Sequence, residues 1–208
     1  MAKPVVYGAD YSVYVRIVRL VLEEKGIDYE LVPVDIFAAD GIPGWYFDHH
    51  PFGRIPAFEH DGFRLYETSA IARYVDEAFD GPALQPVEVQ PRATMNQIIG
   101  LLDAYAYRAM VWDVAVERLE KTVPDEALIA AGLRQARTAL QALSSLKAEG
   151  PWLLGEELTL AELHAAPIVG YFVKVAEGRE LLTEFPDIQA WWDRIAGRES
   201  FAKTEKAE

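Results

Sequence analysis

Cysteine is absent from the 208-residue chain, which excludes disulfide bonds, thiolate metal sites and catalysis by a protein thiol. Long apolar runs are missing as well, since no stretch approaches the roughly 18 apolar residues that a membrane helix needs. Basic residues are few beside acidic ones, 20 against 33, so the formal net charge is −13. A charge of this sign repels phosphate backbones and anionic membranes, and we expect neither nucleic acid nor a membrane as a partner.

The start of the sequence, Met1-Ala2-Lys3-Pro4, carries no apolar signal segment, and we therefore expect a cytoplasmic protein. The hydrophobic content of 51% and the charged content of 25% are ordinary for a globular protein with a real core. A chain of this length can form one large domain or two small ones.

The first part of the chain alternates strand and helix patterns. A strong two-residue turn signal, Asp61-Gly62, separates two short strands. Pro33 lies inside another strand-like run and favours the edge of a sheet, because proline has no N–H for a ladder. The expected elements are a strand over 4–7, a helix over 12–25, a strand over 29–34, the hairpin and a helix over 68–79. Their order is β-α-β followed by β-β-α.

The second part of the chain shows helix patterns alone, over 92–118, 125–147, 159–175 and 187–197. Between the two parts, Pro82 and Pro86 indicate a linker. Thr159 and Glu162 have the spacing of a capping box, in which each side chain satisfies a backbone N–H of the other residue. The fold class predicted here is an α/β domain followed by an all-helical domain.

Several residues could carry chemistry, and each has an ordinary structural interpretation. Ser12 could simply cap a helix, and Glu67 with Thr68 could simply start one. Pro56 opens a strand, where either pairing begins or something other than the sheet pairs with the chain. Because only about 5–6% of X-Pro bonds are cis, the residues alone favour a trans Pro56. His49-His50 without a third ligand suggests polar loop residues, and we predict no metal site.

Taken together, the motifs resemble the cytosolic glutathione S-transferase family, and in particular its bacterial, serine-type theta- and phi-like members. The resemblance covers nearly the whole chain. It rests on "YSVYVRIVRLVLEEKGIDYE", "HPFGRIPAFEHDGFRLYETSAIARYVDEAF", "LLGEELTLAELHAAP" and "FPDIQAWWDRIAGRESF", in that order. It implies a thioredoxin-like glutathione-binding domain over 1–80, a linker over 81–91 and an all-helical C-terminal domain over 92–208.

The resemblance also implies a site for glutathione. It implies a cis Pro56 that leaves the Ile55 backbone to pair with the ligand's cysteinyl unit, in the manner of an added strand. It implies that Glu67 pairs with the γ-glutamyl ammonium, while the Thr68 hydroxyl and the helix N-terminus bind the neighbouring carboxylate. The family usually has serine at the place of Thr68, and the hydroxyl is kept. Arg54 stands where relatives often have Gln or Lys, and either reaches the glycyl carboxylate or is a solvated surface charge.

A free thiol has a pKa of about 8.5, so the enzyme must stabilise the thiolate of glutathione. The resemblance of "SVYVRIVR" to the serine-type classes assigns this role to Ser12 at the positive end of the first helix. A tyrosine-type class would use a tyrosine that ends the first strand, and Tyr7 has that position. Tyr11 and Tyr14 add further hydroxyls, and the absence of cysteine excludes the cysteine-type classes.

The implied activity is attack of the glutathione thiolate on a hydrophobic electrophile, in a transferase of the detoxification type. Glutathione is then a co-substrate, and the family forms homodimers. We expect Tyr11, Tyr107 and Trp112 near the electrophile pocket. Helical spacing places Tyr107 and Trp112 on different faces, so we expect these two to be divided between core and pocket. The alternative function is a non-catalytic member of the fold that binds glutathione or hydrophobic ligands, or serves as a scaffold.

Overall fold

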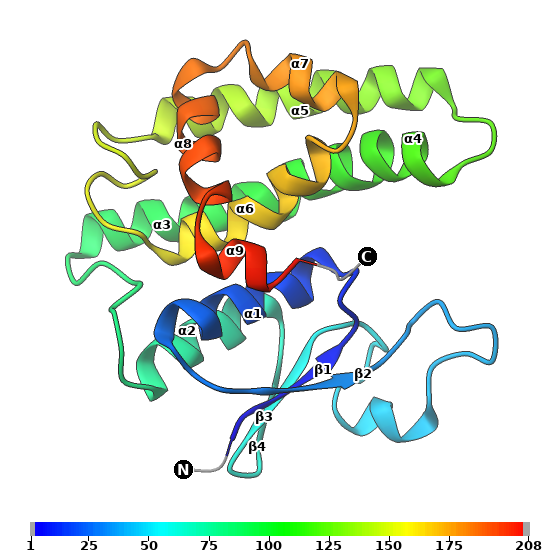
Figure 1. The fold of residues 1–208 in the computed structure, drawn as a ribbon, viewed down its shortest axis with the longest axis vertical. Coiled ribbons are helices and arrows are strands. Elements are labelled where there is room, and N and C mark those ends of the chain that lie inside the picture. The colour runs from blue at the N-terminus through cyan, green and yellow to red at the C-terminus, as the bar shows by residue number, and fades with distance from the viewer. Residues whose placement is uncertain (1–2, 206–208) are drawn as a thin grey trace. The chain divides into compact units, whose positions relative to one another are not determined.

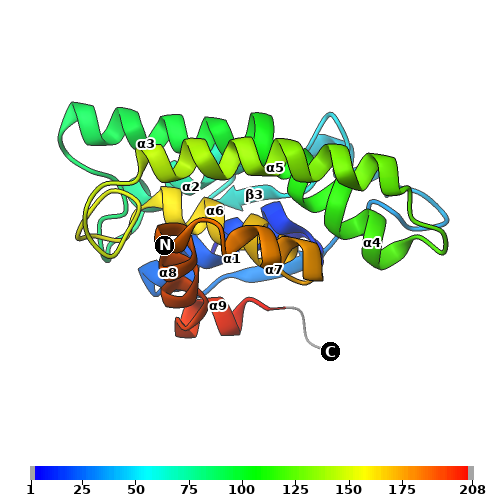
Figure 2. The ribbon, with the colours of Figure 1, turned by 90° about the horizontal axis from the view of Figure 1, so that it is seen from above.

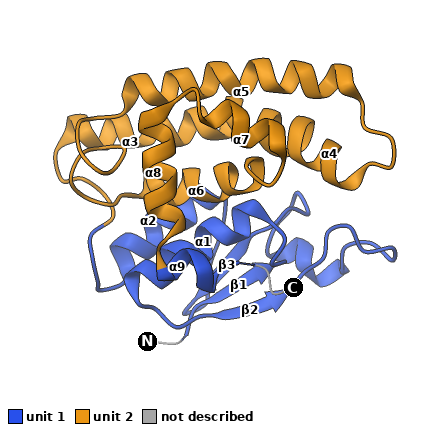
Figure 3. Ribbon diagram, turned by 45° about the horizontal axis from the view of Figure 1, so that its top comes forward, with its two compact units in different colours: residues 1–83, 199–208 blue, residues 84–198 orange. Residues whose placement is uncertain are grey.

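The structure, a computed structural model, describes residues 3–205, and the ends of the two predicted domains, 1–2 and 206–208, lie outside it. The chain forms two compact units, which are coloured separately in Figure 3. Within the described residues, the first unit comprises 3–83 together with 199–205, and the second comprises 84–198.

A four-stranded mixed sheet forms the centre of the first unit, in the order β2-β1-β3-β4. β1 pairs in parallel with β2 and antiparallel with β3, and β3 pairs antiparallel with β4. β2 is an edge strand, as the sequence predicts, and Pro33 is its last residue. The strands are β1 (Val5–Gly8), β2 (Glu30–Pro33), β3 (Ala57–His60) and β4 (Phe63–Tyr66).

The predicted hairpin joins β3 to β4 through Asp61 and Gly62. Both residues have positive φ, 51° and 79°, which is the backbone that a two-residue turn of type I′ requires. The turn fixes the pairing of His60 with Phe63 and hence the register of the hairpin.

Two helices, α1 (Val13–Lys25) and α2 (Thr68–Ala78), complete the thioredoxin-like unit and pack against each other (Figure 1). The apolar residues of α1 recur at helical spacing and are buried, with Val18, Val21 and Leu22 fully enclosed. A short 3-10 helix, η1 (Gly44–Asp48), lies in the light-blue segment between β2 and β3. The predicted β-α-β, β-β-α order is confirmed.

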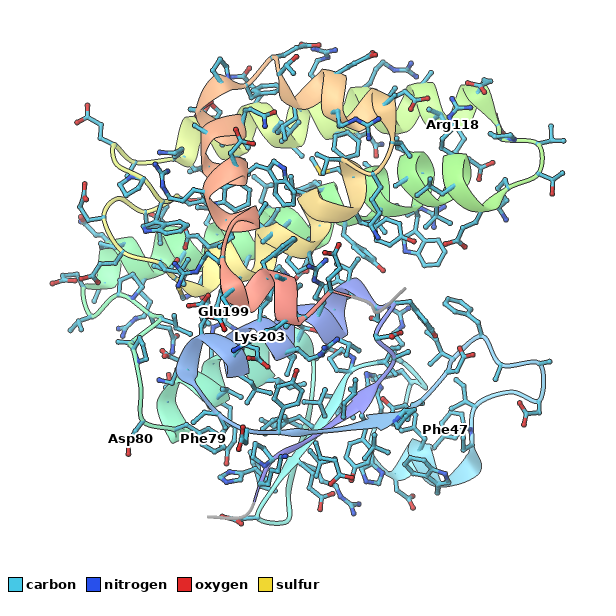
Figure 4. The ribbon with its side chains drawn as sticks, viewed as in Figure 1. Phe47, Phe79, Asp80, Arg118, Glu199 and Lys203 are labelled. Atoms are coloured by element: carbon cyan, nitrogen blue, oxygen red, sulfur yellow. The ribbon has the colours of Figure 1, made fainter. Side chains whose placement is uncertain are left out.

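The C-terminal helix α9 (Glu199–Lys203) packs with the first unit, whereas the sequence-based bounds assign it to the helical domain. The Arg16 guanidinium on α1 donates to the Phe201 carbonyl at 2.8 Å and lies 3.9 Å from the centre of the Phe201 ring. Glu199 and Lys203, both labelled in Figure 4, form an ion pair at 2.9 Å on α9 itself. Arg16 thus holds α9 to α1 through the carbonyl and the ring of Phe201.

The second unit is helical, as predicted. α5 packs along the segment that runs from α3 to α4, and Figure 2 shows these long helices side by side. α6 is buried on nearly all sides, and its predicted capping box is present: the Glu162 carboxylate accepts hydrogen bonds from the Thr159 backbone N–H at 2.7 Å and from the Thr159 hydroxyl at 2.6 Å. The helices are α3 (Val89–Leu101), η2 (Leu102–Ala106), η3 (Arg108–Val116), α4 (Glu117–Glu120), α5 (Glu126–Leu146), α6 (Leu160–Phe172), α7 (Ala176–Leu182) and α8 (Pro186–Ala196).

The first helix of this unit differs from the prediction, because η2 and η3 are π-helical. A π-helix has hydrogen bonds from residue i to residue i+5 and more than four residues per turn, so residues five apart lie above one another. Trp112 therefore reaches Tyr107, and its indole N–H donates to the Tyr107 hydroxyl at 3.0 Å. Arg108 and Asp113, also five apart, form an ion pair at 2.6 Å. The expectation that Tyr107 and Trp112 lie on different faces is wrong, because it assumed 3.6 residues per turn.

No helix within residues 3–205 is both long enough and apolar enough to cross a membrane.

Candidate active site

Ser12 lies at the N-terminus of α1 and is half-buried. Its side-chain oxygen accepts a hydrogen bond from the backbone N–H of Val15 at 3.3 Å, which is the geometry of a helix cap. Its hydroxyl proton is donated to no acceptor within residues 3–205. A hydroxyl donor thus stands at the positive end of a 13-residue helix, where negative charge is stabilised.

Gly8 lets α1 begin close to the end of β1. A Cβ at Gly8 would lie only 2.4 Å from Cγ2 of Val15, so any side chain there would push the first turn of α1 away. The close approach of the strand and the helix therefore fixes the place of Ser12.

Tyr7, the alternative activating residue, lies on the other face of the sheet. Side chains alternate along β1, and the position of Gly8 faces Val15 of α1, so the neighbouring Tyr7 points away from that helix. Its ring packs 4.4 Å from the His49 ring and 6.1 Å from the Trp45 ring, centre to centre. Burial, and after it the Glu59 carboxylate, raises the pKa of Tyr7. A nearby negative charge opposes a second anion such as a thiolate.

The Ile55-Pro56 peptide bond is cis, as the resemblance implies. β3 begins one residue later, at Ala57, which pairs with Tyr7. Within residues 3–205, neither the backbone N–H nor the backbone C=O of Ile55 has a hydrogen-bond partner. An extended ligand could use both groups.

Glu67 has φ 72° and ψ 110°, one of only two positive φ values at non-glycine positions in residues 3–205. Such a backbone costs free energy for a residue with a side chain, and it persists where the surroundings impose it, often at binding sites. The side chain of Glu67 is exposed and makes no cap for α2, which begins at Thr68. The backbone N–H groups of Thr68 and Ser69 have no acceptor among the described residues, so they remain open to an anion.

Arg54 lies just before the cis bond and is exposed. Its carbonyl accepts a hydrogen bond from the buried Tyr46 hydroxyl at 2.6 Å, which ties this loop to η1. Within residues 3–205, its guanidinium forms no hydrogen bond or ion pair. The hydrogen bond from Tyr46 therefore fixes the backbone of Arg54, whereas the guanidinium of Arg54 is available to a ligand.

The hydroxyl of Tyr11 already donates a hydrogen bond within the chain, to Oδ1 of Asp35 at 2.8 Å. Burial and this carboxylate raise the pKa of Tyr11 to about 12. Its ring lies near Phe37, with 5.8 Å between ring centres. Tyr11 therefore offers an aromatic surface rather than a proton.

His50 is a residue that sequence reasoning missed. The pair His49-His50 suggests polar loop residues, yet His50 is only 3% exposed and packs 4.9 Å from the Tyr66 ring, centre to centre. The neighbouring aromatic residues in "GWYFDHHPF" are the signal that could have indicated burial.

Among residues 3–205, no group of three or more acidic or histidine side chains is arranged to hold a metal ion.

Fold and site together define a thioredoxin-like unit with an open peptide-pairing edge, followed by a helical unit. Family models agree with the fold: residues 11–78 match the glutathione S-transferase N-terminal domain, and residues 104–199 match the glutathione S-transferase C-terminal domain. The chain belongs to the glutathione S-transferase family.

Curated plant proteins are among its relatives. Glutathione S-transferase F13 of Arabidopsis thaliana is 30% identical over 203 residues, covering 95% of this chain and 92% of that protein. Glutathione S-transferase 3 of Zea mays is 28% identical over 211 residues, covering 100% and 95%. Among solved structures, poplar glutathione transferase F1 superimposes with a TM-score of 0.85 at 27% identity, covering 98% of this chain and 97% of that one.

Proposed function

We propose that this protein is a glutathione transferase of the serine type that activates the glutathione thiolate for attack on a hydrophobic electrophile. The observation that carries the proposal is the Ser12 hydroxyl, which stands at the N-terminus of α1 with its proton uncommitted among the described residues. The names of the relatives support the same activity. The finer assignment to bacterial theta- and phi-like members stays a prediction.

The ligand would be held by groups that the fold leaves open. The unpaired backbone of Ile55 would pair with the cysteinyl unit, next to the cis Pro56. The open N–H groups at the start of α2 and the Thr68 hydroxyl would bind the γ-glutamyl carboxylate, while Glu67 binds the ammonium. The free guanidinium of Arg54 would bind the glycyl carboxylate.

Ser12 would then donate its proton to the sulfur, and the helix dipole would add positive potential. Both effects favour thiolate over thiol and lower the pKa of the bound thiol from about 8.5. We prefer Ser12 to Tyr7 because Tyr7 faces away from α1, next to the Glu59 carboxylate. The placement of Tyr11, Tyr107 and Trp112 at the electrophile pocket stays part of the proposal, as do a homodimer and a cytoplasmic location.

The test is retention on glutathione resin together with turnover of a chloronitrobenzene substrate. Retention with turnover supports the transferase. Retention without turnover, across a panel that includes peroxides, would favour the non-catalytic binding protein. If the protein were not retained and free glutathione did not bind in solution, the glutathione site itself would be wrong.

A further inference from the structure

The imidazole of His50 is enclosed beside the proposed γ-glutamyl site. Its ring centre lies 4.9 Å from that of Tyr66, the residue directly before Glu67, and 6.2 Å and 6.4 Å from those of Phe52 and Tyr46. Within residues 3–205, its Nδ1 is buried and has no hydrogen-bond partner. A buried ring nitrogen without a partner costs free energy. Nδ1 of His49 and Nε2 of His60 share this property, so what distinguishes His50 is its contact with Tyr66, next to Glu67.

Two charged side chains act on this ring from different segments. Glu67 raises the pKa of His50 and Arg54 lowers it, while burial has the largest effect and brings the pKa below the ordinary value of 6.5. The other titratable groups that face the ring are the phenols of Tyr46 on η1 and Tyr66 on β4, and burial raises the pKa of Tyr46. His50 is therefore neutral at pH 7 and gains its proton in the acid range, where both charged side chains act on it.

We propose that His50 is a positioning residue that makes glutathione binding depend on pH through Glu67, an inference that rests on the proposed function. When His50 is neutral, the Glu67 carboxylate is available to the ammonium group of the ligand. When His50 is protonated, the imidazolium competes for that carboxylate and repels the ammonium. Binding and protonation then oppose each other, and bound ligand must lower the pKa of His50 by the same coupling free energy.

The test is the dissociation constant of S-methylglutathione, measured by calorimetry from about pH 5 to 8, the range in which histidine titrates. This ligand has no thiol, so thiol ionisation does not contribute. In the wild type, the affinity should fall as the pH drops through the pKa of His50, approaching about tenfold per pH unit for one fully coupled proton. His50→Asn should remove that fall.

His49→Asn is the matched control. It also removes one histidine, but Nε2 of His49 lies 3.5 Å from Oε2 of Glu59 and its ring packs on Tyr7, whereas the ring of His50 packs on Tyr66. This variant should keep the wild-type dependence on pH. If the affinity of His50→Asn fell with pH as in the wild type, the role of His50 would be wrong, while the glutathione site itself would stand. Absence of binding to the wild type at any pH would instead reject the glutathione site.

A second measurement needs no variant to fold. The ring proton signal of His50 in the wild-type protein, followed by NMR against pH, should give a pKa that drops when S-methylglutathione is added. An equal pKa with and without bound ligand would overturn the proposal. The four histidines of the chain make the spectrum simple enough to assign.

Discussion

The oxygen of Ser12 accepts a hydrogen bond from the N–H of Val15 at 3.3 Å, and this contact uses a lone pair of the hydroxyl rather than its proton. From the sequence, capping of the helix and activation of the thiol compete for one side chain. In the structure the two roles use different atoms. One serine can therefore cap α1 and still donate to the sulfur of glutathione.

Glu67→Gln should weaken glutathione binding while the fold is kept. The neutral side-chain amide of glutamine cannot form an ion pair with the ammonium group of the ligand. A hydrogen bond to a charged group contributes about 1.5–3 kcal/mol. Calorimetry should show a dissociation constant raised by about 10- to 150-fold. Glu77→Gln, at the other end of α2, makes the same change of charge and should bind as the wild type does. Equal binding by both variants would remove Glu67 from the site.

Trp112→Phe should change the use of the electrophile and leave glutathione affinity unchanged. The variant loses the indole N–H that donates to Tyr107, a neutral hydrogen bond of about 0.5–1.5 kcal/mol, so rates across a series of electrophiles should shift by about two- to tenfold. The exposed Tyr105 offers a control on the same segment, as Tyr105→Phe. Steady-state kinetics that show no change for any electrophile would exclude Trp112 from that pocket.

Thr159→Ala should destabilise the helical unit, because it removes the capping side chain of α6 from a buried network with Glu162. Loss of an N-cap costs about 0.5–2 kcal/mol, and denaturant unfolding should show a loss in this range. Thr138→Ala, on the exposed side of α5, should change the free energy of unfolding by less than about 0.5 kcal/mol. Equal values for the two variants would mean that the Thr159 side chain contributes no stability.

A homodimer is expected, and light scattering should give a mass of about twice the 23.3 kDa chain. Phe52 is 71% exposed in the single chain and is one of the aromatic residues able to contribute to such an interface. Phe52→Ser should weaken association of the two subunits. Phe37→Ser also removes an exposed phenylalanine and is the control for that change. A wild-type mass near 23.3 kDa at micromolar concentration would contradict the expectation.

Local signals account for what the sequence could predict. The Asp61-Gly62 turn, the edge position of Pro33 and the capping box of Thr159 with Glu162 depend on backbone rules that act within a few residues. The apolar spacing of α1 likewise predicts its buried face. These features combine into the correct fold class because each helix and strand is locally consistent with it.

Features that depend on distant contacts could not be predicted. Burial of His50 requires Tyr66, and the docking of α9 requires Arg16, 185 residues before the carbonyl that it binds. The positive φ of Glu67 has no marker, since sequence patterns associate such a backbone with glycine or asparagine. The π-helical turns could not be predicted from a period of 3.6 residues per turn. That period places Tyr107 and Trp112 on different faces, whereas the structure joins them by a hydrogen bond.

The central claim, that Ser12 activates the thiol of glutathione, is tested most directly by the ultraviolet thiolate signal of bound glutathione, followed against pH in folded wild type, Ser12→Ala and Tyr7→Phe. The bound thiol should ionise well below its free pKa of about 8.5 in the wild type and in Tyr7→Phe, and at a higher pH in Ser12→Ala. Unfolding measurements on the same samples separate this shift from the lost cap. An unchanged titration in Ser12→Ala, with a raised pKa in Tyr7→Phe, would contradict the account.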